Sequence, residues 1–157
     1  MTKPSFVYVT YIATTPEKLW QALVDTDVMR QYWFGSAGCA RVNVSDWKPG
    51  SKWEHQRVDE TRTVDVVGRV VENNPPHRLV ITWARPTEAE DESKHSRVTF
   101  DVELQPDGFV RLIVTHAGLE HDPKMLESIS GGWPKVLSNL KTLLETGRAV
   151  LRAAPAK

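Results

Sequence analysis

Apolar residues in the last quarter of the chain follow the spacing of an amphipathic helix. The positions of one face recur every three or four residues, and they are Trp133, Val136, Leu137, Leu140, Leu143 and Leu144. Polar residues fill the positions between them, and Gly147 provides a stop signal. We therefore predict a long C-terminal helix that buries one face.

The start and the middle of this helix carry opposite signals. Asp122 followed by Pro123 is typical of a capped helix start, and the apolar phase reaches back to Met125. Two glycines and Pro134 interrupt the later pattern. A proline inside a helix removes one amide donor and crowds the carbonyl four residues earlier, at a cost of about 3 kcal/mol. We therefore expect a kink or a short break within Gly131–Pro134.

Two-residue alternation and β-forming residues dominate the middle of the chain. Apolar and polar residues alternate most regularly from Val98 to Leu104. Lys48-Pro49-Gly50 and Pro106-Asp107-Gly108 are turn sequences, and the acidic segment Pro86–Lys94 is expected to be a solvated connection. The expected strands are Phe6–Ala13, Ala40–Val44, Lys52–Arg57, Val64–Glu72, Arg78–Ala84, residues 98–104 and Phe109–His116.

Two short helices are expected after the first strand. The first begins with Thr15 as N-cap and Pro16 in the first helical position. The second begins after Asp27 and ends near Trp33-Phe34-Gly35. One strand, two short helices, about six strands and one long helix indicate the α+β class, with a curved antiparallel sheet and the helices on one side.

Composition excludes several classes of protein. A chain of 157 residues fits one domain, 1–157, with a core of about 5–147 and a frayed tail at 148–157. Lys plus Arg and Asp plus Glu number 20 each, which gives no argument for a nucleic acid or an anionic membrane as partner. Cys39 is the only cysteine, so we expect a small packed side chain and no intrachain disulfide. Neither a signal peptide nor a membrane span is visible, and we expect a cytoplasmic protein.

Several local motifs, taken in order, resemble those of the START/Bet v 1-like superfamily, also called SRPBCC. Within it the chain is similar to the branch named for the activator of heat-shock protein 90 ATPase. The motifs are Tyr11-Ile12-Ala13-Thr14-Thr15-Pro16-Glu17-Lys18-Leu19-Trp20, Tyr32-Trp33-Phe34-Gly35, Asp46-Trp47-Lys48-Pro49-Gly50, Asn74-Pro75-Pro76-His77-Arg78-Leu79, Val114-Thr115-His116-Ala117-Gly118-Leu119, and Gly132-Trp133-Pro134 with Leu140-Lys141 and Leu144-Glu145.

The resemblance implies a helix-grip fold, in which six or seven antiparallel strands wrap the C-terminal helix and a cavity opens between them. Members of the superfamily bind lipids, hormones or polyketides, and a few catalyse cyclisation or dehydration. The co-chaperone that names the branch has a further N-terminal domain that contacts the chaperone. This sequence begins at its first expected strand, so we do not expect chaperone activation to be its main role. A weak homodimer is compatible with the resemblance.

Large aromatic and polar residues on the expected sheet and helix supply candidates for the cavity wall. Six tryptophans are present, and indoles either fill a core or line a pocket. From their phase and family position we predict that Trp33, Phe34, Trp53, His55, Trp83, Phe100, His116, Trp133 and Leu137 line the cavity. The alternative is a filled core without a cavity.

His116 is the one weak candidate for a catalytic residue. It ends an apolar strand just before the last helix, where an imidazole could orient a ligand carbonyl or move a proton, or simply bond to the backbone. Arg57, Arg69 and Arg111 lie on expected strands and either pair with a carboxylate in the cavity or face solvent. The histidine spacing suits no metal, so we predict neither a metal nor a cofactor.

Three functions follow, in this order of preference. The first is a non-enzymatic module that binds an apolar or aromatic small molecule. The second is a cyclase- or dehydratase-like enzyme that uses the same cavity with His116. The third is an interaction module for a chaperone or stress partner, which would use Glu88–Glu92 and the exposed helix face. We expect no nucleic-acid partner.

Overall fold

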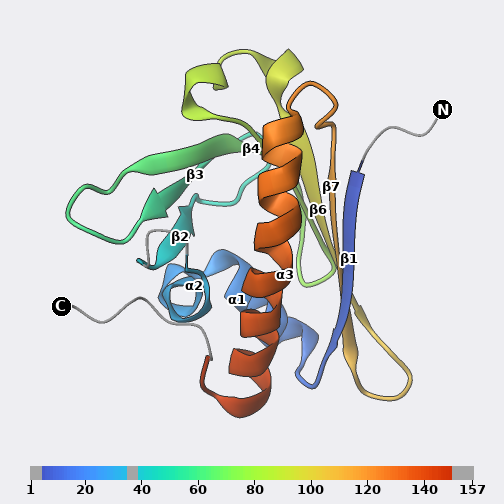
Figure 1. Ribbon diagram of the computed structural model, residues 1–157. Helices are drawn as coiled ribbons and strands as arrows, with labels where there is room; N and C mark the ends of the chain where they lie inside the picture. Colours follow the sequence, from blue (N-terminus) through green and yellow to red (C-terminus); the bar gives the residue numbers. More distant parts are fainter. Residues whose placement is uncertain (1–4, 35–38, 150–157) are drawn as a thin grey trace.

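A seven-stranded antiparallel sheet curls around the long C-terminal helix in the computed structural model (Figure 1). The structure describes residues 5–34 and 39–149. The strands are β1 (Ser5–Ile12), β2 (Arg41–Val44), β3 (Lys52–Arg57), β4 (Val64–Asn74), β5 (Arg78–Trp83), β6 (Ser96–Leu104) and β7 (Val110–Ala117). The helices are α1 (Pro16–Val24), α2 (Thr26–Tyr32) and α3 (Pro123–Thr146), with two short 3-10 helices at Pro86–Glu88 and Glu92–Lys94.

The strand order is β1-β7-β6-β5-β4-β3-β2, so β1 and β2 form the two edges. All six neighbouring pairs are antiparallel. α3 crosses the inner face of the sheet, and α1 and α2 lie beside its C-terminal half (Figure 1). The expected α+β class and helix-grip fold are confirmed.

Alternation along the strands decides which side chains enter the core. In β6, Val98, Phe100 and Val102 are buried, whereas Arg97 and Glu103 face solvent. Leu104 continues the sequence pattern but is exposed, because it lies at the hairpin end of β6, beyond the core. The apolar face of this strand therefore ends at Val102.

α3 runs without interruption through Pro134, so of the two alternatives near Gly131–Pro134 the short break is wrong, and the kink stays a prediction. Ile129 and Trp133 before the proline are buried, and so are Val136 and Leu137 after it. Burying each such side chain contributes about 1.5–3 kcal/mol. Because both halves of the helix are anchored on the same sheet, their packing outweighs the proline's cost of about 3 kcal/mol.

The predicted ends of α3 are confirmed. The Asp122 side chain accepts a hydrogen bond from the Met125 amide at 3.0 Å. Gly147 adopts a left-handed conformation with φ of 81° and donates its amide to the Leu143 carbonyl. This conformation costs a glycine little, which is why the helix ends there.

The short helices follow their caps. Thr15 accepts from the Lys18 amide at 3.2 Å and starts α1 as predicted. α2 starts at Thr26, earlier than predicted, because Asp25 rather than Asp27 supplies the capping carboxylate and accepts the Asp27 amide at 2.8 Å. Gly35, the predicted end of this helix, lies outside the described residues, as do residues 150–157 of the predicted tail.

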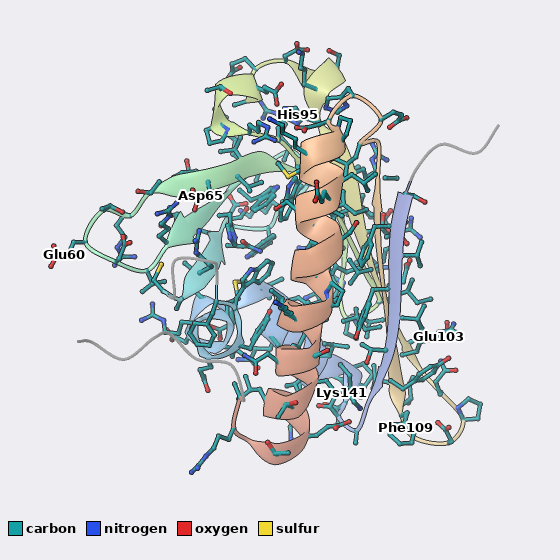
Figure 2. The ribbon with its side chains drawn as sticks, in the orientation of Figure 1. Glu60, Asp65, His95, Glu103, Phe109 and Lys141 are labelled. Atoms are coloured by element: carbon teal, nitrogen blue, oxygen red, sulfur yellow. The ribbon has the colours of Figure 1, made fainter. Side chains whose placement is uncertain are left out.

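One half of the free β1 edge is tied to α3. Lys141 donates to the Tyr11 carbonyl at 2.6 Å (Figure 2), and the Glu145 carboxylate accepts the Ala13 amide at 2.8 Å. Lys141 and Glu145 also bond to each other at 2.6 Å. The helix therefore satisfies backbone groups that would otherwise lie unpaired at the edge of the sheet.

Candidate functional site

A cavity of about 140 Å³ opens between α3 and the inner face of the sheet. Its walls come from the segment after α2, from β3, from β5 and from α3, and they are Trp33, His55, Trp83, Ser128, Ile129, Gly132, Trp133 and Val136. Apolar cavities of about 150 Å³ hold one benzene molecule, whereas typical ligand pockets exceed about 300 Å³. The cavity therefore has room for one ring-sized group.

The helical wall follows from the spacing of its residues. Ile129, Gly132, Trp133 and Val136 recur at intervals of three and four residues, which brings them to one face of α3. A Cβ added at Gly132 would meet no atom within 4 Å, so the missing side chain leaves open space in the wall. Apart from Trp133, our sequence prediction missed these positions, although the helical spacing contained the signal.

Trp133 is the centre of the aromatic wall. Its ring meets Trp33 edge-to-face, with centroids 5.5 Å apart, and Phe100 at 5.9 Å. The Trp83 ring lies 5.6 Å away. Such tilted arrangements stabilise aromatic pairs by about 0.5–1.5 kcal/mol beyond burial. The rings therefore hold each other in place and give the cavity a defined shape.

His116 lies behind this wall and is fully buried. The Trp133 indole, which can only donate, donates to His116 Nδ1 at 3.2 Å. Nε2 must then carry the proton and donates to Ser96 Oγ at 2.8 Å, and Ser96 in turn donates to the Trp83 carbonyl at 3.1 Å. Burial lowers the pKa of His116 to about 4. With both ring nitrogens bonded, the imidazole positions Trp133 rather than facing the cavity.

His55 has the opposite proton arrangement. Its Nδ1 lies 2.7 Å from Asn43 Oδ1, which can only accept, so Nδ1 carries the proton. Nε2 is then an acceptor, and it has no hydrogen-bond partner among the described residues. Burial first, and the positive charge of Arg41 second, lower the pKa of His55 to about 4, against the opposing effect of Asp65. His55 is thus a neutral acceptor in the cavity wall.

Trp83 contributes an unused donor to the same wall. Its Nε1 is buried and has no acceptor among the described residues. By contrast, Trp53 Nε1 donates to the Thr82 carbonyl at 2.8 Å and Trp47 Nε1 to the Val24 carbonyl at 3.1 Å. A buried donor without a partner costs about 1–3 kcal/mol. Because this nitrogen has almost no accessible surface, it is shielded from the cavity, and the unpaired group that the wall offers is the acceptor His55 Nε2.

The structure brings together only part of the predicted cavity set. Trp33, His55, Trp83 and Trp133 line the cavity. Phe100, His116 and Leu137 are buried in the core behind it, because packing against neighbouring side chains leaves them no free surface.

Phe34 and Trp53 border other hollows. Phe34 belongs to a surface depression between α2 and the end of α3. Trp53 points its indole across β4 toward β5. Any binding role for these two residues stays a prediction.

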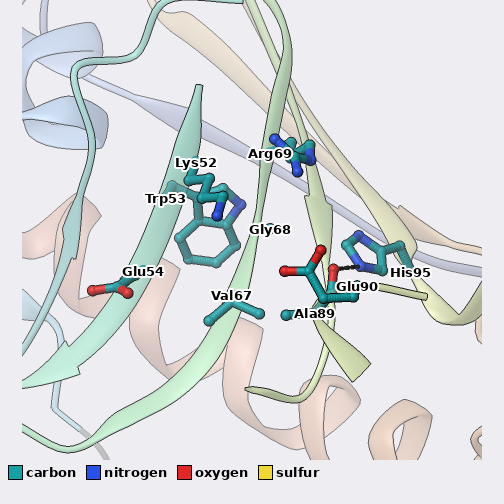
Figure 3. Close-up of a pocket in the computed structure, with 9 residues that line it drawn as sticks. All are labelled: Lys52, Trp53, Glu54, Val67, Gly68, Arg69, Ala89, Glu90 and His95. Atoms are coloured by element: carbon teal, nitrogen blue, oxygen red, sulfur yellow. Dashed lines mark hydrogen bonds between the residues drawn. The ribbon is translucent and has the colours of Figure 1, made fainter. Parts of the chain in front are cut away.

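A second hollow, of about 130 Å³, lies on β3 and β4 beside the Pro86–Glu88 turn (Figure 3). Lys52 and Arg69 line it together with Glu54 and Glu90, so charges of both signs face it. His95 closes one side and donates from Nε2 to the Ala89 carbonyl at 3.1 Å. These charges offset each other, and the hollow shows no selectivity for one kind of ligand.

A charged cluster lies next to His55 at the β2 side of the sheet. Arg57 holds both oxygens of Asp65, at 3.0 and 3.2 Å, and Arg41 bonds to the same carboxylate. Burial alone would raise the pKa of Asp65, but the hydrogen bonds and charges of the two arginines lower it. Arg57 therefore pairs with a carboxylate outside the aromatic cavity, whereas our alternative placed such a pair inside it.

The other two candidate arginines lie outside the cavity. Arg111 donates to Glu103 at 2.8 Å, and Arg69 lies 3.9 Å from Glu92. Within the described ranges, no three His, Cys, Asp or Glu side chains are grouped so that they could hold a metal ion. No helix in this part of the chain is long and apolar enough to cross a membrane.

Comparison with known proteins agrees with the fold. The family model described as "Activator of Hsp90 ATPase homolog 1-like protein" matches residues 13–145. No curated protein matches the sequence significantly.

Solved structures also match over nearly the whole chain. The Aha1 dimer from Colwellia psychrerythraea is 19% identical, with 93% of this chain and 99% of that chain covered, and a TM-score of 0.73. An HSP90 activator from Plasmodium falciparum is 23% identical, with coverages of 89% and 95% and a TM-score of 0.68. A protein from Cytophaga hutchinsonii is 26% identical, with coverages of 90% and 94% and a TM-score of 0.68.

Proposed function

Because the chain belongs to the family of activator of Hsp90 ATPase homolog 1-like proteins, whose fold encloses space between sheet and helix, we propose that it binds a small apolar or aromatic molecule there. The observation that carries this proposal is the cavity of about 140 Å³ walled by three indoles and His55. Apolar concave sites with few polar groups are typical of small-molecule binding.

The size of the cavity limits the expected affinity. A single-ring molecule has few heavy atoms, and even the best small ligands gain no more than about 1.5 kcal/mol per heavy atom. We therefore expect dissociation constants in the micromolar to millimolar range for simple ring compounds. Binding should raise the melting temperature and quench tryptophan fluorescence, because Trp33, Trp83 and Trp133 form the wall.

The two adjacent glycines of α3 provide a matched test. Both glycines are exposed, but Gly132→Leu places a side chain in open space beside the residues that line the cavity, whereas Gly131→Leu makes the same change outside that wall. With toluene as the probe, we expect Gly132→Leu to abolish the thermal shift and the quenching, and Gly131→Leu to retain both. Equal binding by the two variants, or no binding by the unaltered protein, would contradict the proposal.

Binding ranks above catalysis because of His116. Both of its ring nitrogens are bonded to Trp133 and Ser96, so it has no free nitrogen with which to move a proton of a bound molecule. A cyclase- or dehydratase-like reaction would have to use His55 as its base, and the lowered pKa of about 4 makes His55 a weak one.

A chaperone partner is the second candidate, favoured by the family membership and by the likeness to an HSP90 activator. The test is the ATPase rate of an Hsp90-class chaperone with and without this protein. A reproducible acceleration would support the candidate, and an unchanged rate over an excess of the protein would remove it.

A homodimer is proposed on a different observation. Val7, Val9 and Tyr11 form an exposed apolar stripe on the edge strand β1. Hydrogen bonds from α3 reach the Tyr11 carbonyl, the Ala13 amide and the Tyr8 hydroxyl. The Colwellia relative is described as a dimer. Light scattering over a range of protein concentrations tests this, and a monomer throughout would exclude it.

A further inference from the structure

We propose that the aromatic cavity selects a single ring that carries a hydroxyl group, and that this hydroxyl donates to His55 Nε2. The inference rests on the cavity-binding function proposed above and names the chemical class of the ligand. It comes from two unpaired polar groups of the wall, of which Trp83 Nε1 is shielded from the cavity and His55 Nε2 is not.

The first group is the free nitrogen of His55. Asn43 Oδ1 fixes the proton on Nδ1, so Nε2 presents a lone pair and needs a donor. His55 lines the cavity and Nε2 has no hydrogen-bond partner among the described residues. A hydrocarbon would leave this lone pair without a partner, and a buried acceptor left unpaired is unfavourable.

The charged neighbours of His55 keep it in this state. Arg41 on β2 opposes protonation by its charge, and Asp65 on β4 favours it. Burial adds to the effect of Arg41, and the resulting pKa of about 4 leaves the imidazole neutral at pH 7. A carboxylate ligand has no proton to donate at that pH and would set its own lone pairs against that of Nε2.

The second group is the indole N–H of Trp83. Its nitrogen is buried, has no acceptor within the part of the chain that the structure describes, and presents almost no surface to the cavity. It therefore does not compete with His55 for a polar group of the ligand. A carbonyl on the ligand has no hydrogen to donate to His55 Nε2, whereas a hydroxyl is the smallest oxygen group that supplies one.

The size of the cavity selects the rest of the molecule. A volume of about 140 Å³ is close to that of cavities known to hold one benzene ring. The tilted indoles of Trp33, Trp83 and Trp133 offer faces and edges against which such a ring packs. Phenol is therefore the simplest probe of the proposed class, toluene is its counterpart without a hydroxyl, and benzoate is its acidic counterpart.

The test compares the affinities of these probes for three proteins. His55→Phe keeps a ring in the wall but removes the acceptor, and His77→Phe makes the same change at an exposed position outside the cavity. We expect the ratio of the toluene to the phenol dissociation constant to fall about tenfold in His55→Phe. It should stay unchanged in His77→Phe, and benzoate should bind more weakly than phenol to the unaltered protein.

A second measurement needs no variant, so it tests the hydrogen bond to His55 Nε2 even if His55→Phe does not fold. The nitrogen-15 resonance of His55 Nε2 should shift when phenol is added, because that nitrogen gains a donor, and it should move much less with toluene. Binding of both probes with an unaltered affinity ratio, or an unmoved Nε2 resonance, would overturn this inference and leave cavity binding intact. Failure of every probe to bind would overturn the proposed function itself.

Discussion

At Gly68 of β4, the absence of a side chain lets an indole cross a strand. An added Cβ would lie 1.9 Å from the Thr82 carbonyl oxygen and 2.4 Å from Trp53 Nε1. Trp53 uses this gap to reach from β3 to β5, where it donates to the Thr82 carbonyl at 2.8 Å. The Arg69 amide bonds to the Thr82 hydroxyl, at 2.9 Å. The missing side chain at Gly68 therefore makes room for the Trp53 indole where β4 and β5 pack beside the cavity.

We predict that Gly68→Ala is severely destabilising. The nearest atom belongs to the backbone of β5 and cannot move aside as a flexible side chain could, so the added methyl must displace Trp53 or separate the strands. The free energy of unfolding should fall by about 3 kcal/mol or more. Urea unfolding measures this, with Gly131→Ala as control, because a methyl there meets no atom within 4 Å. A stability close to that of the unaltered protein would show that β4 and β5 can adjust freely.

The sequence could not assign roles to the individual tryptophans. Trp53 and Trp83 lie in the same sheet and both point inward, yet one indole is bonded to a backbone carbonyl and the other has no acceptor. The difference depends on the gap at Gly68 and on the interrupted pairing of β4 with β5, and no periodicity reveals either feature. This is why Trp53 was predicted to line the cavity and does not.

At the scale of elements, periodicity predicted most strands and helices because each strand or helix face is buried or exposed as a unit. The bounds of β3 are as predicted, and those of β6 and β7 differ by one or two residues. The exception is the break expected within Gly131–Pro134. Local propensity argued for it, but the packing of α3 on the sheet comes from strands far away in the sequence, which outweighs a local preference.

The continuous α3 contains an avoidable cost at Pro134. Since proline has no amide hydrogen, the carbonyl of Ser130 loses its usual donor. We predict that Pro134→Ala raises the free energy of unfolding by about 2 kcal/mol, which is the helical gain of about 3 kcal/mol less about 0.4–1 kcal/mol for the greater freedom of the unfolded chain. Urea unfolding monitored by circular dichroism measures the change.

Pro123→Ala is the matched control for this prediction. Pro123 occupies the first turn of the same helix, where an amide hydrogen would have no helical acceptor. Its replacement should therefore leave stability unchanged or slightly lower. If Pro134→Ala brings no more stability than Pro123→Ala, the helix must already compensate for the missing hydrogen bond.

At the scale of the whole molecule, the sequence indicated that a cavity exists but not what its wall contains. Trp33, Trp83 and Trp133 were predicted from their large aromatic side chains and from their positions in the strand and helix patterns, and the structure places them around the cavity. His55 and His116 were both named, but only the structure shows that one has a free nitrogen and the other has none. That difference depends on Asn43 and Ser96, two small polar residues that no sequence pattern connects to the histidines.

These two buried histidines give the folded protein a defined dependence on pH. Burial lowers the pKa of each from its usual 6.5 to about 4, so the unfolded chain binds protons at a higher pH than the folded protein does. The stability that the two neutral histidines contribute to the folded protein is fully present above pH 6.5 and is lost as the pH falls toward 4. A shift of this size corresponds to roughly 3 kcal/mol for each histidine, with about 1.4 kcal/mol per pH unit where one extra proton is bound on unfolding.

We therefore predict that the free energy of unfolding, measured with urea at a series of pH values, falls steadily between about pH 6.5 and 4.5. Carboxylates with lowered pKa values, such as Asp65 and Asp122, add to the loss only at lower pH, because their ordinary value is 3.8. His55→Gln removes one titrating group and should reduce the slope by about one proton. A flat curve over this range would mean that both imidazoles are protonated as readily in the folded protein as in the unfolded chain. The cavity wall would then carry a positive charge at His55 below about pH 6.5, and in that range its selectivity would shift from hydroxyl groups to anions.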